Sequence, residues 1–477
     1  MRTYPGALTD ENISHIFRDA ADFIRRELRC GEHTVYAYAI DGLIASAYAS
    51  DYVFKPITQH LTAPNMEALY QHAINGMIYN NVAVSAEDLD RVAFLLVNGF
   101  CVVLFPGVGA IGFEVKTPDK RGTAPPQVEN TVKGAKDAFV ETVRSNTSYV
   151  RRHLRSPDLR IFETQVGRRT LTNISIVWLE GITDPLLVQR MKDRVTSIDV
   201  DGFQSPSAVE EYVTGSRATA FPLMQYTERS DRFSQGILDG QVGLLVDGLP
   251  LGYLAPTDLG YLMKSPEDRG KDFISASCIR VLRYVALLLS LLLPGLYIAM
   301  AAFHQEMIPL TLLRAMIESK EAVPFSTAAE VLGLLIAFEL LQESGVHLPQ
   351  AIGQSVSVIG GIVVGTAAVE AKLISPAALI AVSIAGICGF VQPNRDLAEA
   401  VRVWRFILAI LGAVAGLFGV AVGFLALLIH LSGLNCLGVA YLAPFTRINN
   451  ASLLRRRLYK DKHRDAQFNP QDRRRQK

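Results

Sequence analysis

Apolar residues are distributed unevenly along this 477-residue chain, and that distribution limits its fold more than any other feature. Residues 1–271 carry charged side chains in every window, whereas residues 278–444 contain several long apolar segments with few charges. An apolar stretch of about twenty residues suffices to cross the hydrocarbon layer of a bilayer as a helix. The sequence therefore predicts a soluble region followed by a membrane domain, and the net charge of +1 averages over both.

We expect an α+β N-terminal region made of two related subdomains, followed by an α-helical polytopic membrane domain. Because the first residues lack the apolar core of a signal peptide, the N-terminal region is expected to be cytosolic. The expected regions are an N-terminal α+β subdomain at 1–120, a linker at 121–135, a second α+β subdomain at 136–270, a membrane domain with four or five hydrophobic helices at 271–445, and a basic cytosolic tail at 446–477.

Two stretches of the soluble region resemble each other. Residues 87–115 (EDLDRVAFLLVNGFCVVLFPGVGAIGFEV) and 230–256 (SDRFSQGILDGQVGLLVDGLPLGYLAP) each predict an amphipathic helix, a glycine, a short apolar strand, a Gly/Pro turn and a second strand. Gly99 and Gly240 hold equivalent positions in the two patterns. Because helix–hairpin units are common, the likeness reflects either a duplication or coincidence.

Two other patterns of the soluble region are interpreted as structural. Residues 12–28 (NISHIFRDAADFIRREL) have apolar residues at helical spacing behind a Thr9–Asp10 start signal, and they predict a helix. The glycines of 107–112 (GVGAIG) match the GxGxxG of dinucleotide sites. A strand follows them where such a site needs a helix, so we predict a hairpin turn.

A basic helix is expected after Gly134. Its apolar and basic residues fall mostly on different sides: Phe139, Val143 and Val150 on one, and Arg144, Arg151, Arg152 and Arg155 on another. Nucleic acid is not the expected partner, because the interleaved aromatic residues that stack on bases are missing. We interpret the basic face as a subunit contact or as packing against acidic groups.

No catalytic or metal-binding pattern is found in the sequence. The motifs GxSxG and HExxH and the Walker loop are missing, and the histidines of the soluble region are isolated. The five cysteines are scattered without a CxxC pair, which argues against a disulfide framework and a zinc site. We therefore expect a protein that is not an enzyme and has no cofactor or metal.

Four segments of the second half are long and apolar enough to be membrane spans. They are 284–303, which contains Pro294, and 351–369, 374–391 and 404–431. A fifth apolar segment, 323–341, carries Glu330 and Glu339. Because carboxylates are costly in lipid, this segment is expected to face a partner or water, or to lie re-entrant or at the interface.

Basic residues on both flanks of the membrane domain indicate its orientation. Those at 264–283 and those of the tail place both flanks in the cytosol, which requires an even number of spans. Four spans satisfy this rule, but Arg395, Arg402 and Arg405 then lie on the opposite side.

The segment at 353–370 combines glycines with a terminal carboxylate. Small-residue pairs let helices approach closely, and the glycines expected to pack helices are Gly360, Gly361, Gly365, Gly412 and Gly416. One helical face carries Ser355, Val358, Ile362, Thr366 and Glu370. Repeated around a symmetric ring, this face presents a polar residue, an apolar constriction and an acidic mouth that favours cations. The alternative is a helix packed inside a bundle, with its charged end merely at the membrane interface.

Several stretches are similar to one known family. They are TVKGAKDAFVETVRSNTSYVRRHLRSPDLR, FPLMQYTERSDRFSQGILDGQVGLLVDGLP, HQEMIP and LPQAIGQSVSVIGGIVVGTAAVEAKLISP. In order and spacing, the chain resembles the GerA-type family of bacterial spore germination proteins from about Leu95 to Pro444. Members of that family are the A subunits of nutrient germinant receptors. The N-terminal segment before Leu95 and the basic tail match the family less distinctly.

The resemblance implies a location, partners and a pore. It implies a place in the inner membrane of spores, beside a transporter-like B subunit and a lipoprotein C subunit. It further implies a homo-oligomeric ring that releases monovalent cations when a nutrient arrives. Carried onto this sequence, the helix at 351–369 lines the pore, with Ile362 or Val363 at its constriction. A related branch of the family is not a receptor subunit. HQEMIP is more similar to the receptor type, and SIDVDG also resembles the other branch.

The hypothesis from the sequence is a non-enzymatic subunit of a ligand-gated cation channel. One alternative is a secondary transporter in which Glu330 and Glu339 bind substrate in mid-membrane; it predicts inverted repeats, and none is convincing. A second alternative is a membrane-anchored scaffold of a germination complex, which predicts no ion flux.

Overall fold

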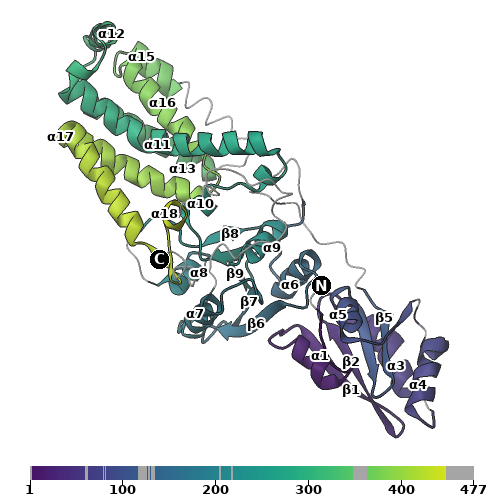
Figure 1. Ribbon diagram of the computed structural model, residues 1–477. Helices are drawn as coiled ribbons and strands as arrows, with labels where there is room; N and C mark the ends of the chain where they lie inside the picture. The colour runs from purple at the N-terminus through teal and green to yellow at the C-terminus, as the bar shows by residue number, and fades with distance from the viewer. Residues whose placement is uncertain are drawn as a thin grey trace.

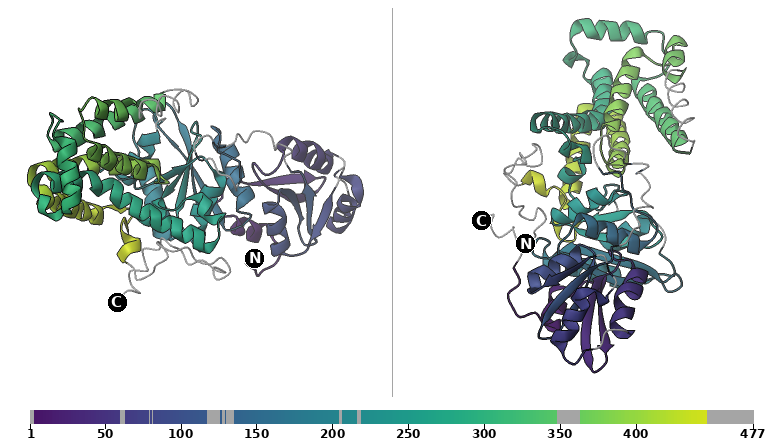
Figure 2. Two further views of the ribbon diagram at one scale, coloured as in Figure 1. Left: turned by 90° about the horizontal axis from the view of Figure 1, so that it is seen from above. Right: turned by 90° about the vertical axis from the view of Figure 1, so that its right-hand side faces the viewer.

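The computed structural model describes residues 3–59, 63–78, 80, 82–116, 126, 129, 135–203, 206–215, 219–347 and 363–446 of the chain. Figure 1 shows three parts in a row: a sheet with helices near the N-terminus, a second sheet in the middle, and a bundle of helices at the far end. Figure 2 shows the same elongated arrangement from two other sides. The expected linker at 121–135 lies almost entirely outside the described residues.

The first part is an antiparallel five-stranded sheet covered by helices on both faces. Its elements are α1 (Asp10–Ile16), β1 (Phe23–Cys30), β2 (His33–Ile40), α2 (Ser46–Ala49), η1 (Ser50–Phe54), α3 (Lys55–Gln59), α4 (Met66–His72), η2 (Ala73–Met77), β3 (Ala83–Ala86), α5 (Leu89–Val97), β4 (Phe100–Phe105) and β5 (Gly109–Glu114). The strand order is β1-β2-β4-β5-β3. Successive strand residues point to opposite faces, so Val103 packs with α2–α4 and Val102 packs with α1 and α5.

The second part is also an antiparallel five-stranded sheet with helices on both faces. Its elements are α6 (Val143–His153), β6 (Leu159–Val166), β7 (Thr172–Leu179), α7 (Pro185–Thr196), α8 (Pro206–Thr214), β8 (Gln225–Thr227), α9 (Ser230–Leu238), β9 (Val242–Val246), β10 (Gly252–Ala255), α10 (Leu259–Leu262) and η3 (Pro266–Arg269). The strand order is β6-β7-β9-β10-β8. Leu245 packs with α6 and α9 on one face, and Leu244 packs with α7 and α8 on the other.

The two sheets share one topology. In each, a helix precedes the first strand, helices join the second strand to the third, and one helix joins the third to the fourth. Helices α5 and α9 are each followed by a glycine with positive φ, Gly99 at +81° and Gly240 at +93°, and then by an antiparallel hairpin. The two patterns singled out in the sequence therefore occupy equivalent places, which favours a duplication over coincidence.

The predicted helix at 12–28 is wrong in its second half. The Thr9 hydroxyl caps α1 by accepting a hydrogen bond from the Asn12 backbone N–H at 3.3 Å, but the helix ends at Ile16. Residues 23–30 form β1 instead, because Gly31 (φ +62°) closes a tight turn and β2 supplies β-branched and aromatic partners. The hairpin predicted at 107–112 is confirmed, since β4 and β5 pair across it.

Helix α6 packs its arginines against acidic groups, which confirms one of the two interpretations of the basic face. The Arg144 guanidinium forms ion pairs with Asp41 at 3.1 Å and with Glu163 of β6 at 2.9 Å. Arg151 is buried and paired with Asp22 of the first part. The helix is therefore a joint between the two sheets.

The last part is a bundle of helices. Its elements are α11 (Phe273–Phe303), η4 (Gln305–Met307), α12 (Leu310–Lys320), α13 (Thr327–His347), η5 (Val363–Ala367), α15 (Ala368–Glu370), α16 (Pro376–Phe390), α17 (Arg395–Gly433), β11 (Asn435–Cys436), β12 (Val439–Ala440) and α18 (Ala443–Thr446). Among the described residues, α11 and α17 are long and apolar enough to cross a membrane by length and composition. Helix α16 forms 15 residues of the predicted span 374–391, and most of the predicted span 351–369 lies outside the described residues.

Helix α17 is a hairpin of two helices rather than a single rod. Ala415 and Gly416 have non-helical backbone angles, and Gly416, at φ +61° and ψ −145°, lies in a region essentially open to glycine alone. The rings of Trp404 and His430 are 5.8 Å apart. A straight helix would separate these residues by about 39 Å. The predicted span 404–431 is therefore not one continuous helix, because Gly416 reverses the chain inside the apolar segment.

Both ends of α17 lie beside the second sheet. We call residues 395–414 α17a and residues 417–433 α17b. The Asp396 carboxylate at the start of α17a contacts Tyr226 of β8, and His430 near the end of α17b contacts Thr219. Arg395, next to Asp396, therefore lies on the side of the second sheet, whereas Arg402 and Arg405 contact the helices of the bundle.

Candidate pore segment and coupling junction

The predicted pore face is divided between described and undescribed parts of the chain. Outside the described residues lie Ser355, Val358, Gly360, Gly361, Ile362 and the side chain of Val363. The described remainder begins with η5, a π-type turn of the kind often found at functional sites. Thr366 and Glu370 are exposed there.

The described end of the candidate pore segment, which we define as residues 353–370, packs against α16. Gly365 is buried, and a Cβ added to it would meet the Leu379 side chain at 3.5 Å, an ordinary contact distance. Lys372, with φ +55°, ends the helical turn of α15, and Pro376 begins α16. This end of the segment is thereby fixed to the bundle, while the Glu370 side chain stays accessible.

Glu330 of α13 is a buried carboxylate that binds the residue just after the pore segment. Its side chain is 2% exposed, and its Oε2 accepts a hydrogen bond from the Ser375 backbone N–H at 2.8 Å. Lys320 Nζ lies 3.5 Å from Glu330 Oε1. A carboxylate inside a bundle requires such partners. The contact joins α13 to the start of α16 and so fixes the chain that follows the candidate pore segment.

Glu339 lies further along α13, ahead of the pore segment. Its Oε1 accepts a hydrogen bond from Arg402 of α17a at 2.7 Å, and the same guanidinium donates to Gln342 Oε1 at 2.6 Å. The two carboxylates singled out in the sequence thus both contact protein groups. One binds a residue that follows the pore segment, and the other holds the helix that precedes it.

Arg405 is a further charge within the bundle, and sequence reasoning assigned it no role. It is 7% exposed, and its Nη2 donates a hydrogen bond to the Ser290 hydroxyl of α11 at 2.5 Å. Its Nε has no hydrogen-bond acceptor among the described residues. Ionisable groups inside membrane bundles are rare and are usually functional. The sequence could have drawn attention to Arg405, because it is a charged residue within the apolar stretch 404–431.

Glycines set the distance between α11 and α17a. A Cβ added to Gly412 would lie 2.7 Å from the Gly295 carbonyl oxygen, and one added to Gly295 would lie 2.9 Å from the Leu408 carbonyl oxygen. Any larger residue would push these backbones apart. Gly412 therefore lies at a helix contact, whereas Gly416 forms the break in α17.

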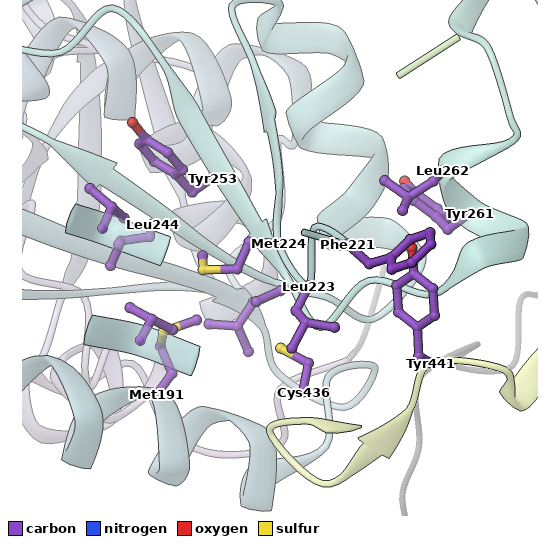
Figure 3. Packing of buried hydrophobic residues seen from close by; sticks show 14 of the residues in the cluster. Met191, Phe221, Leu223, Met224, Leu244, Tyr253, Tyr261, Leu262, Cys436 and Tyr441 are labelled. Atoms are coloured by element: carbon purple, nitrogen blue, oxygen red, sulfur yellow. The ribbon is translucent and has the colours of Figure 1, made fainter. Parts of the chain in front are cut away.

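The second sheet and the bundle share one hydrophobic core, which we call the junction. Figure 3 shows Phe221 and Leu223, which precede β8, beside Cys436 of β11 and the ring of Tyr441. The same cluster includes Leu291 of α11 together with residues of both halves of α17. Protein interiors are packed as densely as organic crystals and transmit displacement. The second subdomain is therefore packed directly against α11 and α17.

Hydrogen bonds reinforce the junction at its edge. The Tyr226 hydroxyl donates to Asp396 Oδ1 at 3.3 Å. Burial raises the pKa of Tyr226 well above its usual value, so the phenol stays protonated and remains a donor. Arg190 of α7 donates to the Leu437 carbonyl at 2.6 Å, which anchors the β11–β12 hairpin to the second subdomain.

Asp268 of η3 joins the second subdomain to the start of α11. It is 2% exposed, and its Oδ2 lies 2.8 Å from Arg283 Nη1 and 3.3 Å from Arg280 Nη2. The same carboxylate completes a capping box with Ser265. Separating α11 from η3 would leave these buried charges without partners, which is costly. The three side chains of Asp268, Arg280 and Arg283, which we call the Asp268 triad, therefore hold the start of α11 against the second subdomain. The sequence signal was the SPED pattern at 265–268, which indicates a cap and not an ion pair.

Comparisons with known proteins agree on one family. A family model described as "Bacillus/Clostridium GerA spore germination protein" matches residues 11–467. In Bacillus subtilis (strain 168), the chain is 32% identical to spore germination protein KA, over 89% of this chain and 79% of that protein. It is 34% identical to spore germination protein A1, over 73% of each chain.

Two further proteins are similar to parts of the chain. The chain is 30% identical to the uncharacterized membrane protein YfkQ of Bacillus subtilis (strain 168), over 92% of this chain and 86% of that protein. A crystal structure of the N-terminal domain of the A subunit of the Bacillus megaterium spore germinant receptor GerK3 aligns with 54% of this chain and 98% of its own length, at 23% identity and a TM-score of 0.41.

Proposed function

This chain belongs to the Bacillus/Clostridium GerA family of spore germination proteins, and on that premise we propose that it is the A subunit of a germinant receptor that forms or gates a monovalent-cation channel. The observation that carries this proposal is the junction. The second soluble subdomain and the apolar bundle share one core, so a signal received by that subdomain can reach the bundle.

The proposed pore is lined by the face of 353–370, repeated around a ring of identical chains. Ile362 or Val363 forms its constriction, and Glu370 stands at its mouth, where an acidic ring concentrates cations. Two observations support this assignment. Thr366 and Glu370 are exposed in the single chain, and the carboxylates of α13 hold the chain on either side of the segment.

The proposed setting is the inner membrane of the spore, with the N-terminal region and the C-terminal tail in the cytosol. Helix α11 leaves the soluble side and α17b returns to it, which supports an even number of crossings. We propose a homo-oligomeric ring as the working unit, with a transporter-like B subunit and a lipoprotein C subunit as partners. Its ligands are then lipid and monovalent cations, and not nucleic acid.

A secondary transporter is the second candidate, and the broken helix α17 is the observation that favours it. Transporters bind ions and substrates where membrane helices are interrupted near the midplane, and Gly416 interrupts α17 within an apolar segment. Such a protein moves substrate in a saturable way through alternating conformations. A channel instead shows ion flux that rises with the driving force.

The proposal is tested in spores that lack this chain, complemented with the native protein or with Ile362→Ala. The matched control is Ile384→Ala, which makes the same change at a 42%-exposed position of α16. Potassium release is recorded with and without nutrient, and the amount of membrane-bound chain is measured by immunoblot.

The channel proposal expects restored nutrient-triggered release with the native chain and with Ile384→Ala. It expects potassium leak or altered gating with Ile362→Ala at equal protein levels, because the constriction is widened. Unchanged release with Ile362→Ala would remove this helix from the pore. Normal nutrient-triggered release in spores without the chain would overturn the receptor assignment.

A further inference from the structure

The N-terminal half of α11, residues 273–289, has an exposed face that is mostly apolar and a buried face that is small or polar. Figures 1 and 2 show this half of the helix at an angle to the other helices of the bundle. Its exposed face carries a stripe at helical spacing, made of Ile274, Cys278, Val281, Leu282, Val285, Leu288 and Leu289, with the exposed Ser275 beside it in the first turn. These positions recur at steps of three and four, so they form one continuous face.

The exposed stripe is apolar from the first turn of the helix onward. Ile274 is 70% exposed, Leu282 is 59% exposed and Leu288 is 47% exposed. Monomeric soluble proteins rarely expose contiguous apolar patches of this kind.

The buried face of the same helix is small or polar. It carries Ala276, Ser277, Arg280, Arg283 and Ala286. Both arginines turn inward to Asp268, and the Arg283 guanidinium also donates to the Met263 carbonyl at 3.2 Å. Charged groups thus face the protein, while large aliphatic side chains face outward.

This arrangement is inverted relative to a helix of a soluble protein. In water, an amphipathic helix buries its apolar face and exposes its charges. A helix lying in the membrane interface instead directs its apolar face into the acyl chains. The stripe also runs without interruption into the part of α11 that is apolar enough to cross a bilayer.

We infer that residues 273–289 form an in-plane membrane segment whose Ile274–Leu289 stripe contacts the acyl chains of the cytosolic leaflet. The helix lies on the membrane surface before it enters the bundle, and the Asp268 triad fixes the second subdomain to its inner face. The soluble subdomain is thereby held at a set height above the lipid. This inference rests on the membrane association proposed above, and not on ion conduction.

Lipid is the occupant that the structure favours. The large side chains of the stripe are aliphatic from Ile274 to the part of α11 that is apolar enough to cross a bilayer. Arg280 and Arg283, which could pair with a polar partner chain, instead face inward to Asp268. Packing against a second copy of the chain is the competing outcome, and the test must separate the two.

Cys278 supplies a native probe on the stripe. The full chain with Cys388→Ala is labelled at Cys278 with an environment-sensitive fluorophore, since Cys30, Cys101 and Cys436 are buried. The control carries Cys278→Ala, Cys388→Ala and Leu186→Cys, which places the label at a 47%-exposed position of α7 in the second subdomain. Both proteins are reconstituted into phosphatidylcholine vesicles, and quenching by brominated acyl chains is compared with quenching by aqueous iodide.

We expect the label on Cys278 to be quenched by brominated lipid and shielded from iodide, and the label on Leu186→Cys to behave in the opposite way. Iodide quenching of Cys278 at the level of the control overturns the inference while leaving membrane association intact. Shielding from both quenchers, with oxidation of the unlabelled protein giving a Cys278-linked dimer, overturns it in favour of a second copy. A chain that does not enter the vesicles overturns both this inference and the proposed function.

Discussion

Arg151 of α6 and Asp22, just before β1, form a bidentate ion pair that joins the two soluble subdomains. The Arg151 Nε and Nη2 atoms each donate to a carboxylate oxygen of Asp22 at 2.7 Å, and both side chains are 1% exposed. Beside this pair, Ala20 forms a parallel β-bridge to Ile161, so the first subdomain extends the edge of the second sheet. The two subdomains are thus held together by polar contacts that water does not reach.

Arg151→Met is expected to destabilise the soluble region by about 3–5 kcal/mol, because it leaves the Asp22 carboxylate buried without a partner. The matched control is Arg18→Met, which removes the exposed pair between Arg18 and Glu180 and should cost less than about 1 kcal/mol. Denaturant unfolding in detergent, followed by the fluorescence of the buried Trp178, measures both. Equal losses in the two variants would mean that burial of the Arg151 pair contributes nothing.

Gly416→Ala is expected to destabilise the bundle by about 1–3 kcal/mol, because alanine is strained at the backbone angles of this position. An added Cβ would also lie 2.9 Å from the His304 ring. Gly333→Ala is the control, since its Cβ would meet nothing within 4 Å and its backbone is helical. Thermal denaturation of the detergent-solubilised chain compares the two. A native melting temperature for Gly416→Ala would argue against the hairpin.

The α17 hairpin predicts a specific membrane topology. Single cysteines at Glu399, whose side chain is 64% exposed, and at Ser432, which is also exposed, should react with an impermeant maleimide from the same side. A cysteine at Val414, beside the apex and 73% exposed, should react from neither side if the apex lies in lipid. Labelling is measured on sealed vesicles of known orientation. Reaction of Glu399→Cys and Ser432→Cys from opposite sides would show a single crossing instead.

The Glu339–Arg402 pair predicts a charge-reversal effect on gating. Glu339→Arg alone places like charges together, which releases α13 ahead of the pore segment, and we expect potassium leak from spores without nutrient. The double variant Glu339→Arg with Arg402→Glu should restore the closed state, because it re-forms the pair. Potassium efflux at matched protein levels is the readout. If the double variant leaks as much as the single one, the pair does not act in gating.

The sequence predicted those features that depend on local patterns. Hydrophobic periodicity and the glycines at positions 99 and 240 revealed the repeated helix–hairpin unit, and a run of apolar residues identified α11. It did not reveal the break at Gly416, because residues on both sides of it are equally apolar and a glycine there also suits close helix packing. Residues 23–28 were misread as helix because their strand is decided by pairing with β2.

The junction was beyond the reach of sequence reasoning for a different reason. Tyr226 and Asp396, or Arg190 and Leu437, are far apart in the chain and belong to no local pattern. Only the folded arrangement brings them together. The carboxylates of α13 were recognisable as unusual from their apolar surroundings, but their partners Ser375 and Arg402 were not.

If this chain supplies the cation path, the acidic mouth formed by Glu370 sets the ion preference of the pore. Ionic currents through the reconstituted receptor complex are recorded in planar bilayers for the native chain, Glu370→Gln and Glu370→Asp. We expect a nutrient-evoked potassium current whose preference for cations falls in Glu370→Gln and is retained in Glu370→Asp, because only the former removes the charge of the ring. An absence of current, or an unchanged cation preference in Glu370→Gln, would contradict it.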